Sequence, residues 1–285
     1  MSIVVTGATG HLGRLIVESL LRRGVPAGEV VALGRDTGRL ADLADLADRG
    51  VIVRRADYDD VESLRAAFAG AEQLAFVSGT DIGRRVEQAR NVVTAAQEAG
   101  VRLIAYTSAP KADTSSLILA VDHRGTEQVI ADSGLPYVFL RNSWYFENYL
   151  PQIPTYLEHG IAGAAGDGRI SGAARADYAE AVAAVLTTEG HAGRVYELGG
   201  AGFTMTELAE ELSRQTGRQI GYTDLPVEKY VEVLVGAGLP RGYAEVLADG
   251  DRAAAQGELH VEGDDLAKLI GREPTTLAEA IRAAL

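Results

Sequence analysis

The chain of 285 residues contains no cysteine, one tryptophan and two methionines. Without cysteine it can form no disulfide, no thiolate zinc site and no iron–sulfur cluster, and a cysteine nucleophile is excluded as well. Its five histidines are scattered along the chain, without the spacing of metal ligands beside carboxylates. We therefore expect no metal site.

Positive charge is also scarce. The 27 lysines and arginines are outnumbered by 40 acidic residues, which leaves a formal net charge of -13. A nucleic-acid surface needs clustered lysine and arginine, so we expect no nucleic-acid partner. No apolar run approaches the roughly 20 residues of a membrane helix, and the first residues form a strand-like run that leaves no room for a signal peptide. These absences predict a cytoplasmic protein without a membrane partner.

Hydrophobic residues make up 47% of the chain, enough for a sizeable core. In the first half, strand-like runs alternate with helix-like runs. The strand-like runs lie at residues 3–5, 30–33, 51–53, 74–77, 103–106 and 137–140. This alternation predicts an α/β fold, a Rossmann-like doubly wound parallel sheet in the order 3-2-1-4-5-6. Such a sheet binds ligands outside the carboxyl ends of its strands, between strands 1 and 4.

The regular alternation ends after Arg141. Residues 142–176 are rich in glycine, proline and aromatics, and helix-like or strand-like runs follow at 176–188, 195–198 and 205–217. We predict an NAD(P)-binding Rossmann domain over residues 1–150. A smaller, mostly helical C-terminal lobe over residues 151–285 is expected on the substrate side, partly interleaved with the first domain.

Three glycines follow the first strand-like run in a GxxGxxG pattern, at Gly7, Gly10 and Gly13. Glycines at this spacing let the backbone pass close to a pyrophosphate, and the following helix points its free N–H groups at that charge. The alternative is a glycine-rich turn without a ligand. We favour nucleotide binding, with contacts from Thr6, Gly7, Ala8, Thr9, Gly10, His11, Leu12 and Gly13.

The second strand ends at Gly34-Arg35, 22 positions after Gly13. A carboxylate here would accept hydrogen bonds from a ribose 2′-OH and repel a 2′-phosphate, whereas an arginine binds the phosphate. Arg35 therefore predicts NADPH as the cofactor. The alternative is a solvated Arg35 at the start of a helix, with Asp36 contacting the ribose.

Two further strand ends face the same predicted cleft. Asp57 follows the third strand, where a side chain can meet the adenine edge. Ser78, Gly79 and Thr80 follow the fourth strand, where small residues permit close approach to the ribose and nicotinamide half. We expect cofactor contacts at all four positions. The alternative is that these residues, which are common in loops, contact no ligand.

Together, residues 6–13, 34–35, 56–58, 106–108 and 140–149 resemble the atypical, NmrA-like short-chain dehydrogenases/reductases. Residues 112–115, 163–168, 175–178, 195–198 and 269–271 are similar to the bacterial NADPH:quinone oxidoreductases of type 2 within that family. The resemblance spans essentially the whole chain. It implies NADPH-dependent reduction of quinones by direct hydride transfer, without flavin. It also implies further cofactor contacts at Asn142, Ser143, Trp144, Tyr145, Phe146 and Glu147.

The Tyr-x-x-x-Lys pair that most short-chain dehydrogenases use for proton transfer is missing. The three lysines are Lys111, Lys229 and Lys268, and none lies four residues after a tyrosine. Gln128 stands where the related quinone reductases have a lysine. A quinone does not need this pair, because aromatisation to the hydroquinone makes hydride acceptance favourable and the enzyme must mainly position the reactants.

Aromatic residues are concentrated on the expected substrate side. Seven of the 17 in the chain fall within residues 137–156. Trp144, Tyr145, Phe146 and Tyr149 come just after the sixth strand, where a small planar electrophile such as a quinone would stack. The alternative for these side chains is packing within the C-terminal lobe.

Four residues are candidates for catalysis. Asn142 and Tyr145 can orient substrate or cofactor, Ser108 can bond a substrate oxygen, and His123 can donate a proton. The corresponding structural alternatives are loop capping for Asn142, closure of a strand for Ser108 and a packed or solvated histidine for His123. We expect Arg175 and Asp177 to be structural.

Two classes of function fit these patterns. The first is an enzyme, an NADPH-dependent quinone reductase acting as a monomer or homodimer. The second is an NmrA-like redox sensor that binds NADP(H) and has no turnover. The aromatic run after Arg141 favours the enzyme, because a sensor needs no cavity beside the nicotinamide.

The assignment of Arg35 can be tested by the substitution Arg35→Ala. The KM for NADPH is expected to rise far more than the KM for NADH, because only NADPH carries the 2′-phosphate. Steady-state kinetics with each cofactor measures the two values. Equal increases for both cofactors would contradict the assignment.

Overall fold

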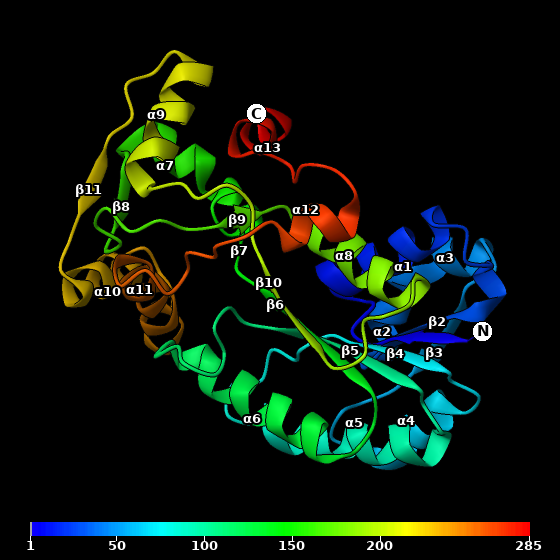
Figure 1. Ribbon diagram of the computed structural model, residues 1–285. Coiled ribbons are helices and arrows are strands. Elements are labelled where there is room, and N and C mark those ends of the chain that lie inside the picture. Colours follow the sequence, from blue (N-terminus) through cyan, green and yellow to red (C-terminus); the bar gives the residue numbers. More distant parts are fainter. Residues whose placement is uncertain (1) are drawn as a thin grey trace.

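The computed structural model describes residues 2–285. At its centre is a seven-stranded sheet in the order β3-β2-β1-β4-β5-β6-β10, with all neighbouring strands parallel (Figure 1). The strands are β1 Ile3–Val5, β2 Val30–Gly34, β3 Ile52–Arg55, β4 Gln73–Phe76, β5 Leu103–Ser108, β6 Tyr137–Asn142 and β10 Arg194–Leu198. The predicted Rossmann-like, doubly wound sheet and its order 3-2-1-4-5-6 are confirmed.

The sequence pattern predicts that residues 195–198 belong to the C-terminal lobe, whereas in the structure they form the seventh strand of the sheet. β10 instead pairs with β6, with Val195 opposite Phe139 and Leu198 opposite Asn142. Helix α8 (Arg175–Thr187) brings the chain back to the sheet and supplies the crossover that a parallel strand requires. A boundary at residue 150 remains our proposal, with residues 175–198 as the interleaved part.

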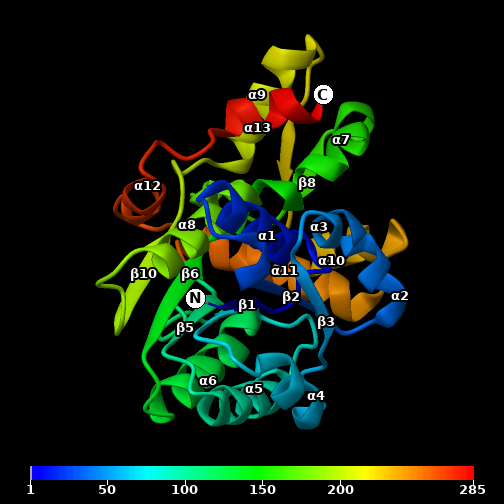
Figure 2. The same ribbon diagram turned by 90° about the vertical axis from the view of Figure 1, so that its right-hand side faces the viewer.

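Helices cover both faces of the sheet (Figure 2). On one face lie α4 Val61–Phe68, α5 Arg85–Ala99 and α6 Ile118–Asp132, and on the other α1 His11–Arg22, α3 Ala44–Asp48, α8 and α12 Asp265–Ile270. Side chains alternate along a strand, so Val4 packs into the core on the face covered by α4, α5 and α6. Ile3 and Val5 pack into the core on the opposite face. The two cores exclude water from both faces of the sheet and leave the carboxyl ends of its strands uncovered.

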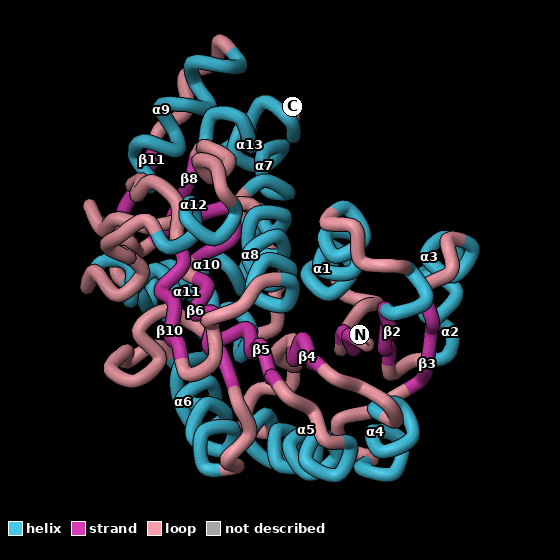
Figure 3. The backbone as a smooth tube through the Cα atoms, turned by 45° about the vertical axis from the view of Figure 1, so that its right-hand side comes forward, coloured by secondary structure: helices cyan, strands magenta, loops and turns pink. Residues whose placement is uncertain are grey.

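The C-terminal lobe lies beside these carboxyl ends and has its own core, which includes Phe146, Phe203 and Leu208 (Figure 3). Its helices are α7 Ile153–His159, α9 Met205–Thr216, α10 Val227–Gly236, α11 Arg241–Ala255 and α13 Leu277–Ala284. Its short strands are β7 Trp144–Tyr145, β8 Ile161–Gly163, β9 Gly172–Ala173 and β11 Tyr222–Asp224. Within residues 2–285, no helix combines the length and the apolar character needed to cross a membrane.

A buried arginine joins the sheet to its surroundings at the end of β6. Arg141 donates from Nε and Nη2 to the two carboxylate oxygens of Glu127 on α6, at 2.9 and 2.7 Å. Its Nη1 lies 3.0 Å from both Asp113, in the loop after β5, and Glu197 on β10. The guanidinium therefore holds α6, β10 and this loop in place where the chain leaves the sheet for the lobe.

A second buried carboxylate connects α8 to the C-terminal segment. Asp177 is fully buried and accepts hydrogen bonds from Arg272 Nη2 at 2.7 Å and from the Thr275 backbone N–H at 2.8 Å. The more exposed Glu180 accepts from the same Arg272 nitrogen at 2.7 Å. Asp177 therefore has the structural role that was expected from the sequence.

This pair of carboxylates allows a matched test of stability. Asp177→Ala is expected to lower the free energy of unfolding by about 2–3 kcal/mol, because the Thr275 N–H and the Arg272 guanidinium lose a charged, fully buried acceptor. Glu180→Ala removes a half-buried partner of the same, more exposed arginine and should cost less than about 1 kcal/mol. Urea denaturation of the two variants checks this. Similar losses for both would contradict the role given to burial.

Candidate cofactor-binding site

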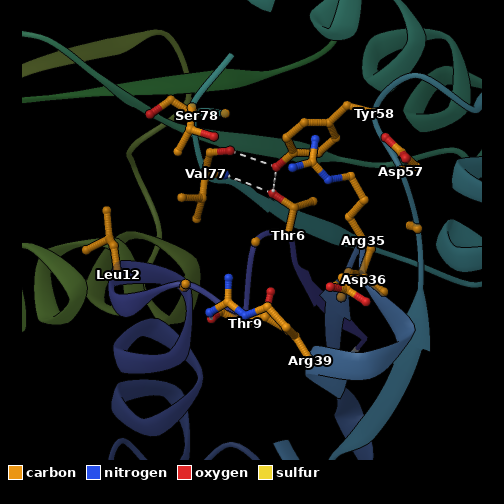
Figure 4. A pocket seen from close by; sticks show the side chains of 18 of the residues that line it. Thr6, Thr9, Leu12, Arg35, Asp36, Arg39, Asp57, Tyr58, Val77 and Ser78 are labelled. Carbon is orange, nitrogen blue, oxygen red and sulfur yellow. Dashed lines mark hydrogen bonds between the residues drawn. The ribbon is translucent and has the colours of Figure 1, made fainter. Parts of the chain in front are cut away.

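A cavity of about 570 Å³ opens at the carboxyl ends of β1 to β4, where a doubly wound sheet binds its ligand (Figure 4). It is lined by Thr6, Gly7, Thr9, Gly10, His11, Leu12, Gly13, Leu33, Gly34, Arg35, Asp36, Arg39, Ala56, Asp57, Tyr58, Val77, Ser78, Gly79, Thr80, Asp81, Gln88 and Arg175. The cavity thus brings together the glycine turn and the ends of the second, third and fourth strands, as the sequence pattern predicted.

The glycine turn is shaped by close backbone contacts. A Cβ on Gly13 would lie 2.3 Å from the carbonyl oxygen of Gly7, so helix α1 can pack against the turn only without a side chain there. Gly7 has φ +62°, which also favours glycine. The N-cap of α1, Gly10, has no capping side chain, so the first N–H groups of the helix are available to an anion. Ala8, in contrast, is a core residue.

Tyr58 fixes the wall between the first and fourth strands, a role that the sequence did not indicate. Its hydroxyl lies 2.5 Å from Thr6 Oγ1 and 2.7 Å from the Val77 carbonyl oxygen (Figure 4). Thr6 Oγ1 also accepts from the Val77 backbone N–H at 3.0 Å. Burial raises the pKa of Tyr58, so its hydroxyl stays protonated at neutral pH. Thr6 is therefore a support of the cavity wall as well as part of its lining.

Two arginines face the cavity from the end of β2 and from helix α2 (Thr37–Leu40). Arg35 extends from β2 toward Tyr58 and pairs with Asp81, its Nη1 3.1 Å from Oδ2 (Figure 4). Arg39 donates from Nη2 to the Thr9 carbonyl oxygen at 2.6 Å, beside the glycine turn. Asp36 caps α2 by accepting from the Gly38 N–H at 2.8 Å, which gives it a structural role.

The remaining predicted loop residues also lie on the cavity. Asp57 lines it, and its carboxylate accepts from the Asp59 N–H at 3.1 Å. Ser78, Gly79 and Thr80 form the opposite wall after β4. Both segments thus line the cavity, and the Asp57 carboxylate also shapes its own turn.

Asn142 and Tyr145 lie side by side at the end of β6. Asn142 Nδ2 donates to the Tyr145 hydroxyl oxygen at 3.3 Å. Asn142 Oδ1 is buried and has no hydrogen-bond partner in the described chain. A buried acceptor of this kind is costly unless a ligand donates to it. Burial raises the pKa of Tyr145, so its hydroxyl remains a neutral donor.

Arg175 connects this pair to the cavity. Its guanidinium carbon lies 5.0 Å from the centre of the Tyr145 ring, and Arg175 itself lines the cavity. Its backbone N–H donates to the Glu147 carboxylate at 3.0 Å, which caps α8. The sequence pattern predicts a structural role for Arg175, because it indicates only that a helix starts there. It does not show that the Arg175 side chain reaches the cavity.

The rest of the aromatic run packs within the lobe. Phe146 and Tyr149 contact Phe203, and Trp144 lies close to Gly250 on α11. Ser143 donates to the Leu259 carbonyl oxygen at 2.9 Å. The described lining of the cavity does not include residues 142–147. In the structure, the packing alternative therefore accounts for Trp144, Phe146 and Tyr149, and cofactor contact at 142–147 remains a prediction.

Ser108 and His123 are engaged inside the protein. Ser108 donates to Glu127 at 2.6 Å, within the Arg141 network. The Nδ1 atom of His123 lies 2.8 Å from the Tyr106 hydroxyl, and burial lowers the pKa of His123 to about 3. A histidine with this pKa is neutral at pH 7, so it lacks the imidazolium form that would serve as a general acid. Gln128 is exposed and bonds Asp132 at 2.8 Å, away from the cavity.

Comparison with known proteins agrees with this geometry. The model of the NmrA-like family matches residues 1–281. The chain belongs to the NmrA-like family. The predicted membership is thereby confirmed. The chain is 48% identical to quinone oxidoreductase 2 of Escherichia coli over 281 residues, which cover 98% of this chain and 97% of the relative.

Solved structures of family members superpose closely. The E. coli NADPH-dependent quinone oxidoreductase in complex with NADPH has a TM-score of 0.95 at 47% identity, with 99% of each chain covered. The Citrobacter sp. triphenylmethane reductase in complex with NADP(H) has a TM-score of 0.94 at 40% identity, with 100% of each chain covered. Both relatives thus hold the same class of dinucleotide on this fold.

The glycine turn yields a direct test. Gly13→Ala is expected to weaken NADPH binding at least about 100-fold, because the added methyl group displaces α1 from the turn that faces the pyrophosphate. Gly28→Ala is the matched control, since a Cβ there meets nothing within 4 Å. Fluorescence titration with NADPH measures both variants, and circular dichroism confirms folding. A folded Gly13→Ala variant with wild-type affinity would contradict the proposed cradle.

Proposed function

We propose that this protein binds NADPH and uses it to reduce quinones by direct hydride transfer, without flavin. The observation that carries the proposal is the cavity in which the uncapped start of α1 and the Arg35 guanidinium face the same space. Full-length similarity to an NADPH-dependent quinone oxidoreductase supports it. The proposed substrate is a small planar electrophile such as a quinone.

The residues present suit NADPH at each part of the molecule. The turn at residues 7–13 would receive the pyrophosphate, and Arg35 with Arg39 would receive the 2′-phosphate. Asp57 would contact the adenine edge, and residues 78–80 the ribose and nicotinamide half. The unpaired Oδ1 of Asn142 offers an acceptor for the carboxamide N–H of the nicotinamide.

Bound NADPH supplies the hydride, and the quinone becomes the hydroquinone once a proton is added. The protein's own contribution is positioning and exclusion of water. Asn142 donates to the Tyr145 oxygen, which leaves the Tyr145 proton free to bond an oxygen of the substrate. Arg175 holds the Tyr145 ring from the cavity side. Because Ser108 and His123 already have internal partners, solvent is the proposed source of the final proton.

The alternative of a sensor without turnover is less well supported. A sensor would need only the cofactor cavity. This chain also has, at the end of β6, the Asn142 amide beside the Tyr145 hydroxyl, and only the nitrogen of that amide is hydrogen-bonded. The sequence similarity to a quinone oxidoreductase extends through this part of the chain. Location in the cytoplasm and a monomeric or homodimeric state remain predictions from the sequence.

The decisive assay combines the purified protein, NADPH and several simple quinones, and follows the loss of nicotinamide absorbance. We expect quinone-dependent oxidation well above the rate without protein. Oxidation at background rate with every quinone, by a protein that still binds NADPH, would favour the sensor.

Variants of Asn142 and Gln128 refine this assay. Asn142→Ala should lower kcat/KM about tenfold, the effect of losing roughly one hydrogen bond at the reacting end. Gln128→Lys restores the residue typical of related quinone reductases on an exposed surface of α6 and should leave kcat/KM within about twofold. A large gain of activity in Gln128→Lys would contradict the arrangement proposed for the site.

A further inference from the structure

Arg35 already has an anionic partner within the cavity. Its Nη1 atom lies 3.1 Å from Asp81 Oδ2, and both side chains line the cavity. Arg35 comes from the end of β2 and Asp81 from the loop between β4 and α5, so the ion pair bridges two walls. Figure 4 shows the Arg35 side chain extending from β2 toward Tyr58. The guanidinium proposed to bind the 2′-phosphate is therefore held by a carboxylate of the same chain.

Asp81 differs from the other carboxylates that line the cavity. Asp36 and Asp57 each accept a backbone N–H within their own turns, at 2.8 and 3.1 Å. Asp81 instead accepts from side chains, Arg35 at 3.1 Å and Gln88 Nε2 at 3.4 Å. It can therefore exchange one partner without disturbing a turn.

The loop that carries Asp81 is anchored independently of Arg35. On one side, Arg85 Nε donates to the Gly79 carbonyl oxygen at 2.7 Å. On the other, the Gly83 N–H donates to Asp122 at 2.6 Å. Movement of Arg35 would therefore leave Asp81 in place beside the cavity.

Asp81 also stays ionised in this setting. The hydrogen bond from Gln88, together with the charges of Arg35 and Arg84, holds the pKa of Asp81 below its usual value. After Arg35 leaves, Gln88 and the positive charge of Arg84 remain near the carboxylate. The cavity thus keeps a negative charge beside the arginine that is expected to bind a phosphate.

We propose that Asp81 is a specificity-determining residue that competes with the 2′-phosphate of the cofactor for Arg35. The proposal rests on the NADPH binding proposed above. A phosphate dianion can bind a guanidinium through two oxygens and is a stronger partner than a single carboxylate oxygen, so it takes Arg35 from Asp81. A ribose 2′-OH offers no such anion and leaves the pair intact.

The competition lowers the affinity for a 2′-phosphate, and Asp81 offers Arg35 a partner to return to when the oxidised cofactor leaves. Removing the carboxylate should therefore strengthen binding of the phosphorylated ligand alone. This sign is opposite to that of a residue that merely holds Arg35 in its binding position.

The test is Asp81→Asn, measured by isothermal titration calorimetry with two nucleotides. Adenosine 2′,5′-bisphosphate is expected to bind about three- to fivefold more tightly than to the wild type, the range for loss of a competing exposed ion pair. Adenosine 5′-monophosphate should change by less than about twofold, because it has no 2′-phosphate. Neither measurement depends on quinone turnover.

Two control variants test whether the change in bisphosphate binding comes from the Arg35–Asp81 ion pair. Asp59→Asn makes the same charge change nearby, since Asp59 bonds Arg84 and Gln88 but lies outside the cavity lining. It should leave bisphosphate binding within about twofold. In an Arg35→Ala background, Asp81→Asn should no longer strengthen bisphosphate binding, because no guanidinium remains to compete for.

Weaker binding of the bisphosphate to Asp81→Asn would overturn the proposal, because Asp81 would then be positioning Arg35. An equal gain in affinity for both nucleotides would also overturn it, because the Arg35–Asp81 pair would then hinder nucleotide binding whether or not a 2′-phosphate is present. If the wild-type protein bound neither nucleotide, the cofactor assignment would fail together with this proposal. Nucleotide binding as expected without quinone turnover would contradict only the proposed enzymatic activity.

Discussion

The buried guanidinium of Arg141 is the interaction on which the arrangement of this protein depends. A charge removed from water is tolerated only when it is fully paired, and Arg141 is paired with Glu127, Glu197 and Asp113. These partners come from a helix, a neighbouring strand and a loop, so the ion network fixes all three against β6. The next residue is Asn142, and the network thereby fixes the point at which β6 ends.

The site itself is asymmetric in charge and in hydrogen bonding. One end presents the uncapped start of α1 and two arginines, each already bonded to the protein through Asp81 or through the Thr9 carbonyl oxygen. At the end of β6, outside the described lining, Asn142 has a buried amide oxygen without a hydrogen-bond partner, beside the phenol of Tyr145. The proposed binding of NADPH would exchange internal partners at the arginine end and would satisfy the buried acceptor of Asn142.

Much of the fold and of the cavity lining could be predicted from the sequence, because the patterns that indicate them involve only neighbouring residues. Glycines at 7, 10 and 13, after a β-branched strand, place a turn and a helix start, and Arg35 at the end of the second strand lies on the same edge of the sheet. The aromatic run could not be resolved in the same way. Whether Phe146 faces a ligand or Phe203 depends on a residue 57 positions further along the chain.

The sequence by itself determined the doubly wound sheet, its strand order and the positive charge at the end of β2, since periodicity and turn chemistry act over a few residues. Only the tertiary structure decided that β10 completes the sheet, that Arg175 lines the cavity and that Asp81 pairs with Arg35. Those contacts join segments dozens of residues apart, and burial and charge pairing at such separations are properties of the packed chain rather than of any local pattern.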